Sequence, residues 1–252
     1  MGWSRREAIG LALAAGVGGL AGCDRHAAAP WREDDGRFPM PEQTAGLFEE
    51  GSRHQLSVGD WVTATTRSAG MLSMPTGRLI AADPSWLPSA QRLHIGPYTA
   101  TVPAGSYPVS LAVVSWPGDR RVAAARLTVR NELVHRWEMA LLPGQDVAAL
   151  APGEAYNVGV DSATMAFLDA AALSPMARQV DNEPKAFQRT AEDQPLEVPG
   201  TESSGNLIAF GTGYGDGGYP VWIGRTTAGA VGCFMADMAM LRRQQSSATP
   251  NR

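Results

Sequence analysis

Short runs of apolar or alternating residues recur along the middle of the chain, and each is bounded by Gly, Pro, Asp or Asn. Such runs favour β-strands over helices, because alternate residues of a strand face opposite sides of a sheet. Trp116-Pro-Gly-Asp-Arg120 separates two of these runs and predicts a tight hairpin turn. The predicted strands are residues 60–65, 78–82, 107–116, 121–129, 135–141 and 156–160.

The second half of the chain predicts one short helix and three more strands. Residues 163–173 are rich in Ala and Leu, which favours the helix. Residues 174–205 are polar and predict a long surface connection. Gly-rich turns join predicted strands at 206–210, 219–223 and 230–235, an arrangement typical of a meander. We therefore expect a mostly β fold of antiparallel strands, or an α+β fold with one or two short helices.

The first residues have the pattern of an export signal. Arg5 and Arg6 precede an uncharged stretch, 8–22, that is shorter than the roughly 20 apolar residues of a membrane-spanning helix. Leu20-Ala-Gly-Cys23 resembles the bacterial lipobox, in which the cysteine is acylated before cleavage. We expect a lipoprotein signal peptide at 1–22 and lipidation of Cys23. The alternatives are an ordinary signal peptide and a buried helix.

Ser4-Arg-Arg-Glu-Ala-Ile9 also resembles the twin-arginine export signal, although Ala8 stands where Phe or Leu is usual. The alternative is the general export route. The lipidated Cys23 would begin a polar, Pro-containing tether at 23–50, followed by a single strand-rich domain at 51–241 and a disordered tail at 242–252. This organisation predicts that the protein is anchored on the extracytoplasmic face of a membrane in the cell envelope. The sequence does not distinguish the inner from the outer membrane.

Composition narrows the functional classes. The net charge of -4 gives no electrostatic reason to expect a nucleic-acid partner. The four histidines are scattered and Cys-x-x-Cys is absent, so we expect no metal site, and no cofactor is identified. Cys233 lies in an apolar run, which favours a small buried residue over a nucleophile.

Gly211 to Pro220 is the most conspicuous segment. Its Gly-x-Gly-x-x-Gly string precedes a strand rather than a helix, which argues against dinucleotide binding. One interpretation is a hairpin turn in which Asp216 caps its own backbone. The other is a binding loop at the lip of a pocket, formed by Gly213, Tyr214, Gly215, Asp216, Gly217 and Tyr219.

A second acidic residue, Asp161, ends an apolar strand. It could cap the helix predicted at 163–173, which is the commoner use of Asp in this position. Strand ends also position catalytic carboxylates rigidly. If Asp161 and Asp216 converge, the pair could serve as general acid and base or bind a hard cation.

Several segments resemble the bacterial family of unknown function numbered 4241, over about residues 75–241. The resemblance implies one domain in which the Asp161 and Asp216 segments belong to the core pattern, and it implies no activity, cofactor or catalytic residue. The segments that carry it are Thr76–Pro84, Val102–Val109, Arg121–Arg126, Arg136–Leu141, Tyr156–Asp161 and Gly211-Thr-Gly-Tyr-Gly-Asp-Gly-Gly-Tyr-Pro-Val-Trp-Ile-Gly224.

Three hypotheses for function follow. A membrane-anchored binding or interaction module comes first, because no assembled catalytic set is visible and exposed loops on strands suffice for binding. The second is an Asp-dependent hydrolase acting on an envelope polymer. The third is a protective protein, such as an immunity protein against a toxin.

Overall fold

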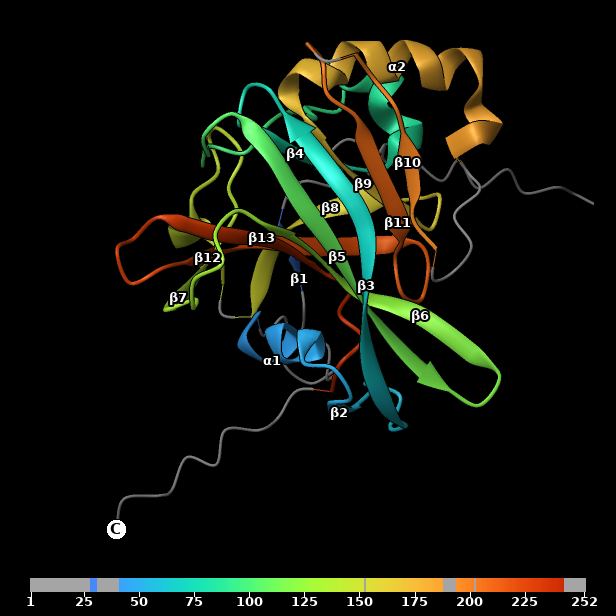
Figure 1. The fold of residues 1–252 in the computed structure, drawn as a ribbon, viewed down its shortest axis with the longest axis vertical. Coiled ribbons are helices and arrows are strands. Elements are labelled where there is room, and N and C mark those ends of the chain that lie inside the picture. Colours follow the sequence, from blue (N-terminus) through green and yellow to red (C-terminus); the bar gives the residue numbers. More distant parts are fainter. Residues whose placement is uncertain (1–27, 31–40, 152, 188–193, 202, 243–252) are drawn as a thin grey trace, which may run out of the picture.

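The computed structural model describes residues 28–30, 41–151, 153–187, 194–201 and 203–242 (Figure 1). The predicted signal peptide, Cys23 and nearly all of the predicted tail lie outside these residues. Within them, none of the helices has both the length and the apolar character needed to cross a membrane.

Thirteen described strands form two antiparallel sheets, which confirms the predicted mostly β fold. The large sheet has the order β1-β8-β12-β13-β6-β5-β3-β2, and β7 also pairs with β12. Its strands are β1 Ala28–Pro30, β2 Arg53–Gln55, β3 Trp61–Met74, β5 Gly105–Trp116, β6 Asp119–Thr128, β7 Arg136–Met139, β8 Glu154–Val160, β12 Gly217–Arg225 and β13 Val231–Asp237.

The small sheet has the order β10-β11-β9-β4 and is covered on its outer side by helices. Its strands are β4 Leu79–Ala82, β9 Thr164–Asp169, β10 Leu196–Val198 and β11 Leu207–Gly211. The helices are α1 Pro41–Ala45 and α2 Leu173–Asn182, with short 3₁₀ turns η2 Gly46–Phe48, η3 Pro84–Ser89, η4 Val147–Ala149, η5 Ala170–Ala172 and η6 Pro184–Phe187. Figure 1 shows α2 above the small sheet and α1 at the opposite end of the molecule.

Side chains of the small sheet alternate between two cores. Phe167 and Phe210 point into the core shared with the large sheet and pack edge to face, with 5.0 Å between ring centroids. Leu168 and Leu207 point the other way, into the core formed with Met176 and other residues of the helices. The fold therefore has three layers, and the small sheet is buried on both faces.

This burial explains the main error of the sequence prediction. The helix predicted at 163–173 is wrong, because residues 164–169 form β9, in which every residue is buried. A strand covered on both faces loses the polar alternation that identifies strands, and a short apolar run is then indistinguishable from a buried helix. The helix starts later, at Leu173.

Three other predictions need correction. The connection at 174–205 is not continuous loop, since it contains α2 and β10. The meander fails because β11 pairs with β9 and β10, while only β12 and β13 pair with each other. The predicted tether contains structure too: Ala28–Pro30 pairs with β8, and residues 41–48 form α1 and η2.

Candidate functional site

The Gly-rich segment forms a compact loop between β11 and β12. The Gly215 amide donates to the Thr212 carbonyl at 2.8 Å, and the Thr212 hydroxyl donates to the Gly215 carbonyl at 2.8 Å. Gly213 has φ 54°, and a Cβ atom there would lie 2.9 Å from the sulfur of Met240. The positive φ at position 213 is strained for any residue with a side chain, and a Cβ there would also press against the Met240 side chain.

Tyr219 supports this loop from inside. Its side chain is only 5% exposed, and its hydroxyl lies 2.9 Å from the Thr212 carbonyl and 2.6 Å from the Gly215 carbonyl. The expectation that Tyr219 stands at the lip of a pocket is corrected by this burial. Tyr214, by contrast, is 41% exposed at the tip of the loop.

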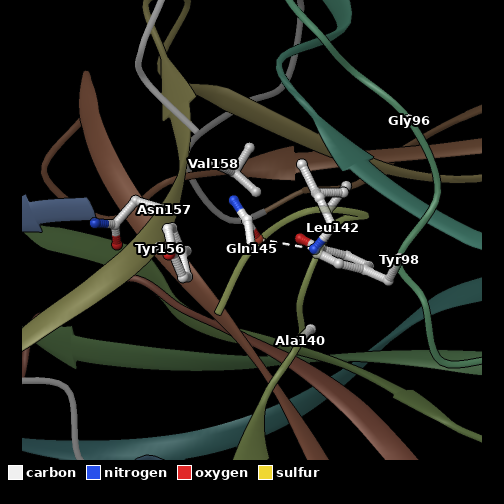
Figure 2. Close-up of a pocket in the computed structure, with 9 residues that line it drawn as sticks. Gly96, Tyr98, Ala140, Leu142, Gln145, Tyr156, Asn157 and Val158 are labelled. Atoms are coloured by element: carbon white, nitrogen blue, oxygen red, sulfur yellow. Dashed lines mark hydrogen bonds between the residues drawn. The ribbon is translucent and has the colours of Figure 1, made fainter. Parts of the chain in front are cut away.

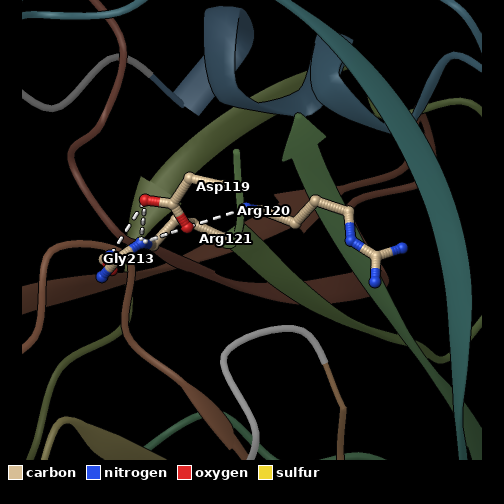
Figure 3. Close-up of polar contacts among 4 residues, drawn as sticks. All are labelled: Asp119, Arg120, Arg121 and Gly213. Carbon is tan, nitrogen blue, oxygen red and sulfur yellow. Dashed lines mark hydrogen bonds and ion pairs between the residues drawn. The ribbon is translucent and has the colours of Figure 1, made fainter. Parts of the chain in front are cut away.

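Arg121 ties the same loop to the β5–β6 hairpin (Figure 3). Its guanidinium donates to the Gly213 carbonyl at 3.2 Å. The same group contacts the Asp119 carboxylate, with Nε 3.0 Å from Oδ2 and a terminal nitrogen 3.0 Å from the same oxygen. Because the hairpin belongs to the large sheet, this contact fixes the loop against a rigid element.

The turn after β8 is held by a buried carboxylate from another segment. Asp83, which has no exposed surface, follows β4 and accepts hydrogen bonds from the Asp161 amide at 2.8 Å and the Ser162 amide at 2.9 Å. It also accepts from the Ser162 hydroxyl at 2.7 Å. Local sequence gives no sign that Asp83 is connected to Asp161, because 78 residues separate the two.

The structure brings the Asp161 turn and the Gly-rich loop together. In the antiparallel β8–β12 pair Val160 lies opposite Gly217, which places Asp161 and Asp216 at the same end of these strands. Asp216 accepts a hydrogen bond from the Ala163 amide at 2.9 Å, and the Thr212 amide donates to the Ala163 carbonyl at 3.1 Å. We call residues 161–163 and 212–216 together the two-loop surface.

Both simple interpretations of the acids are therefore corrected. Asp161 caps no helix, because β9 follows it. The described bond of Asp216 is to the opposite loop rather than to its own backbone. Both residues are exposed, and Ala163 is held at φ 52°, a conformation that is costly for a residue other than glycine. The surface is thus a strained, tightly bonded structure that presents two acids and Tyr214 to solvent.

The described part of the chain was searched for metal ligands and for a reactive cysteine. No group of three or more His, Cys, Asp or Glu residues there could hold a metal ion. Cys233 is a buried free cysteine, as predicted, and burial raises its pKa to about 11 although Arg126 opposes the shift. Cys233 is therefore protonated at neutral pH and is not an activated nucleophile.

A small pocket lies beside β8, between it and the chain that follows β7 (Figure 2). It has a cavity volume of about 10 Å³, close to the size of one water molecule. Sequence reasoning missed it, because its residues come from four separate segments. The lining residues are Ala81, Gly96, Tyr98, Ala140, Leu142, Gln145, Tyr156, Asn157 and Val158.

Comparison with known proteins identifies the family. Residues 72–236 match the model of DUF4241, described as a protein of unknown function, and the chain belongs to this family. No curated protein and no solved structure matches the chain significantly. The matched region spans β4 to β13, including both loops of the two-loop surface.

Proposed function

We propose that the protein is an exported lipoprotein, anchored through Cys23 on the extracytoplasmic side of a membrane, whose domain is a binding module. The lipobox and the preceding apolar stretch support the anchor. Ala28 pairs with Tyr156 of β8, and the five residues from Cys23 to Ala28 can span at most about 18 Å. The acylated cysteine would therefore hold this edge of the large sheet near the bilayer.

The observation that carries the binding role is the rigidity of the two-loop surface. Asp83, Tyr219 and Arg121 fix its two loops from beneath through buried or partly buried hydrogen bonds. Tyr214 and the two acids remain exposed on this fixed base. A partner that binds here meets a surface whose loops are already ordered, so binding loses less conformational entropy.

The second candidate is the Asp-dependent hydrolase, which is favoured by the position of Asp161 and Asp216 at the same end of β8 and β12. Against it, one carboxylate oxygen of Asp216 already accepts the Ala163 amide. The small cavity lies further along β8 and is lined by neither acid. A binding role accounts for these observations without a substrate cleft.

Anchoring is tested by expressing the full chain in a bacterium supplied with radiolabelled palmitate. The wild-type protein should incorporate label and remain with the membrane fraction, and Cys23→Ser should lose the label. Cys233→Ser is the matched control and should keep it. Labelling of the Cys23→Ser variant, or export of an unlabelled wild-type protein, would reject the anchor.

The binding role is tested in intact cells with a photo-crosslinking residue at position 214. We expect a discrete crosslinked product that is reduced by Asp216→Asn, which removes charge but keeps the acceptor oxygen for Ala163. A crosslinker at Val147, which is 51% exposed on another loop, is the control. Identical products at both positions would contradict a specific surface. Release of envelope polymer fragments that depends on Asp161 and Asp216 would favour the hydrolase instead.

A further inference from the structure

Two buried nitrogen donors on one face of the large sheet have no acceptor. The Nε of Arg126 on β6 and the Nε1 of Trp222 on β12 are both buried, and neither forms a hydrogen bond with any residue that the structure describes. A third such atom, the Thr226 hydroxyl, lies just beyond the end of β12. Buried N–H groups nearly always have an acceptor, so the two nitrogens indicate an acceptor that the described residues do not supply.

Strand register places these two donors in one row across the sheet. Met235 of β13 lies opposite Arg126 on one side and opposite Trp222 on the other, and residues paired in this way point to the same face. Leu127 and Phe234, the next residues along β6 and β13, point into the core shared with the small sheet, so the row faces the other way. The backbones of the two donors are separated by two strand spacings, roughly 10 Å. Both side chains are long enough to extend over Met235.

Arg126 forms no ion pair with any residue that the structure describes. Its guanidinium carbon lies 4.1 Å from the centroid of the Phe48 ring, and this cation–π contact holds the side chain against η2. Asp237, further along β13, accepts from Thr44 and Ala239 instead. Burial lowers the pKa of Arg126, but a guanidinium keeps its proton at neutral pH. Arg126 therefore presents a positive charge that these residues do not neutralise.

The surroundings favour a carboxylate over other acceptors. A guanidinium offers Nε and a terminal nitrogen in one plane, and a carboxylate can accept from both at once. Arg126 supplies a single charge, and its neighbours Phe48, Met235 and Trp222 are apolar, so a dianionic phosphate would keep one negative charge without compensation. Arg126 and Trp222 are each only partly buried as whole residues, which leaves part of the row open to solvent. The apolar body of a small organic acid fits against Met235 and Trp222.

We propose that this row binds a small organic monoanion through its carboxylate group, with Arg126 and Trp222 as the two donors and Met235 beneath the ligand. The site lies within the region that matches the family. It is separate from the two-loop surface, and its occupancy does not depend on the lipid anchor. Either proposal can therefore fail without the other.

The test follows the Trp222 indole N–H in the full-length protein labelled with nitrogen-15. The chain has seven Trp residues and therefore seven indole signals in a proton–nitrogen correlation spectrum, and Trp222→Phe assigns one of them by removing it. The probes are acetate, hexanoate and benzoate. At least one of them should move the Trp222 signal downfield and saturably, because a new acceptor deshields the indole proton. Benzamide, which has the shape of benzoate without its charge, should bind about tenfold more weakly than benzoate.

Variants of Arg126 separate its two contributions. Arg126→Lys keeps the charge but removes the buried Nε and the planar fork, so the affinity for the probe should fall roughly tenfold. Arg126→Met keeps an unbranched side chain against Phe48 without the charge, and the affinity should fall roughly a hundredfold. Arg53→Lys is the matched control, because the Arg53 guanidinium also lies over an aromatic ring, 5.6 Å from the centroid of Trp61, but on an exposed residue. This control should bind with unchanged affinity, and thermal unfolding should confirm that each variant folds.

Three results would overturn the proposal. The first is a Trp222 signal that none of the three acids moves, or equal affinity in the wild type and the folded Arg126 variants. The second is tighter binding of inorganic phosphate than of benzoate. The third is binding that appears only when Glu33→Gln, Asp34→Asn and Asp35→Asn are combined, because acids of this chain would then compete for the two donors.

Discussion

Asp83 and Asp237 are both buried carboxylates at strand ends, and the structure gives them very different surroundings. Asp83 accepts five hydrogen bonds, from the amide and hydroxyl of Ser85, the amide and hydroxyl of Ser162 and the amide of Asp161. Asp237 accepts two, from the Thr44 hydroxyl at 2.8 Å and the Ala239 amide at 2.8 Å. The first supports the two-loop surface, and the second attaches α1 to the end of β13.

The difference shows what burial does to a carboxylate when donors are few. Burial disfavours the charged form, and hydrogen bonds to that form oppose the effect. At Asp237 the effect of burial exceeds that of the two donors, and the pKa rises to about 6. Asp83 gathers donors from two segments, residue 85 and residues 161–162, and these hydrogen bonds organise the turn that carries Asp161. The contact between α1 and Asp237 should therefore depend on pH.

The largest expected effect comes from removing the more highly bonded carboxylate. Asp83→Ala leaves five donors without their acceptor. We expect a loss of about 4 kcal/mol in the free energy of unfolding, measured by urea denaturation. Asp60→Ala, at an exposed position, should change it by less than about 0.5 kcal/mol. Equal losses in the two variants would show that Asp83 does not organise the turn.

Asp237 should make stability depend on pH. Its pKa rises from an ordinary value of 3.8 to about 6, so the folded state binds the proton more tightly than the unfolded state. The contribution to stability is therefore complete below pH 3.8 and is lost as the pH rises through 6. We expect a loss of roughly 3 kcal/mol across this window.

The measurement compares the wild type with Asp237→Asn, so that the pH dependence contributed by all other groups cancels. The free energy of unfolding of the wild type minus that of Asp237→Asn should fall as pH increases across the window, because Asn cannot titrate. A difference that stays constant, or increases with pH, would mean that the Asp237 carboxylate is not destabilised by burial.

A smaller effect follows from removing one of the two donors to Asp237. Thr44→Val deletes the hydroxyl that favours the charged form, so the pKa of Asp237 should rise further. At neutral pH we expect a loss of about 1.5 kcal/mol. Thr44→Ser restores the hydroxyl and should restore most of the stability and the pH midpoint. Failure of this rescue would indicate that packing of the threonine methyl group, rather than its hydroxyl, holds α1.

The local pattern of hydrophobic and polar residues was sufficient to predict many of the strands. Strands β5 and β6 are long runs joined by the turn-forming Trp116-Pro-Gly-Asp-Arg120, and the structure pairs Trp116 with Asp119 across that turn. Pattern failed for β9, whose two buried faces remove the alternation. It also failed to place β11 in the small sheet, since neighbouring strands in sequence usually pair and the loop at 212–216 crosses between sheets instead.

The same limit applies to the candidate site. Asp161 and Asp216 could be identified because each stands next to a strand in a distinctive local sequence. Their shared base could not, because Asp83, Arg121 and Tyr219 reach it from separate segments. The cavity at Tyr98 has no sequence signature at all, since it results from contacts between segments that are individually ordinary.

The smallest effect should come from removing one donor out of the five at Asp83. Ser162→Ala deletes the hydroxyl that donates to Asp83 Oδ1, which also accepts the amide and the hydroxyl of Ser85. Two donors remain on that oxygen, so we expect a loss of only about 0.5–1 kcal/mol in the free energy of unfolding. Ser85→Ala should behave similarly, because its amide stays in place. The double variant should lose more than the sum of the two, since the amides alone would then hold the carboxyl group. Simple additivity would mean that the five donors act independently rather than as one network.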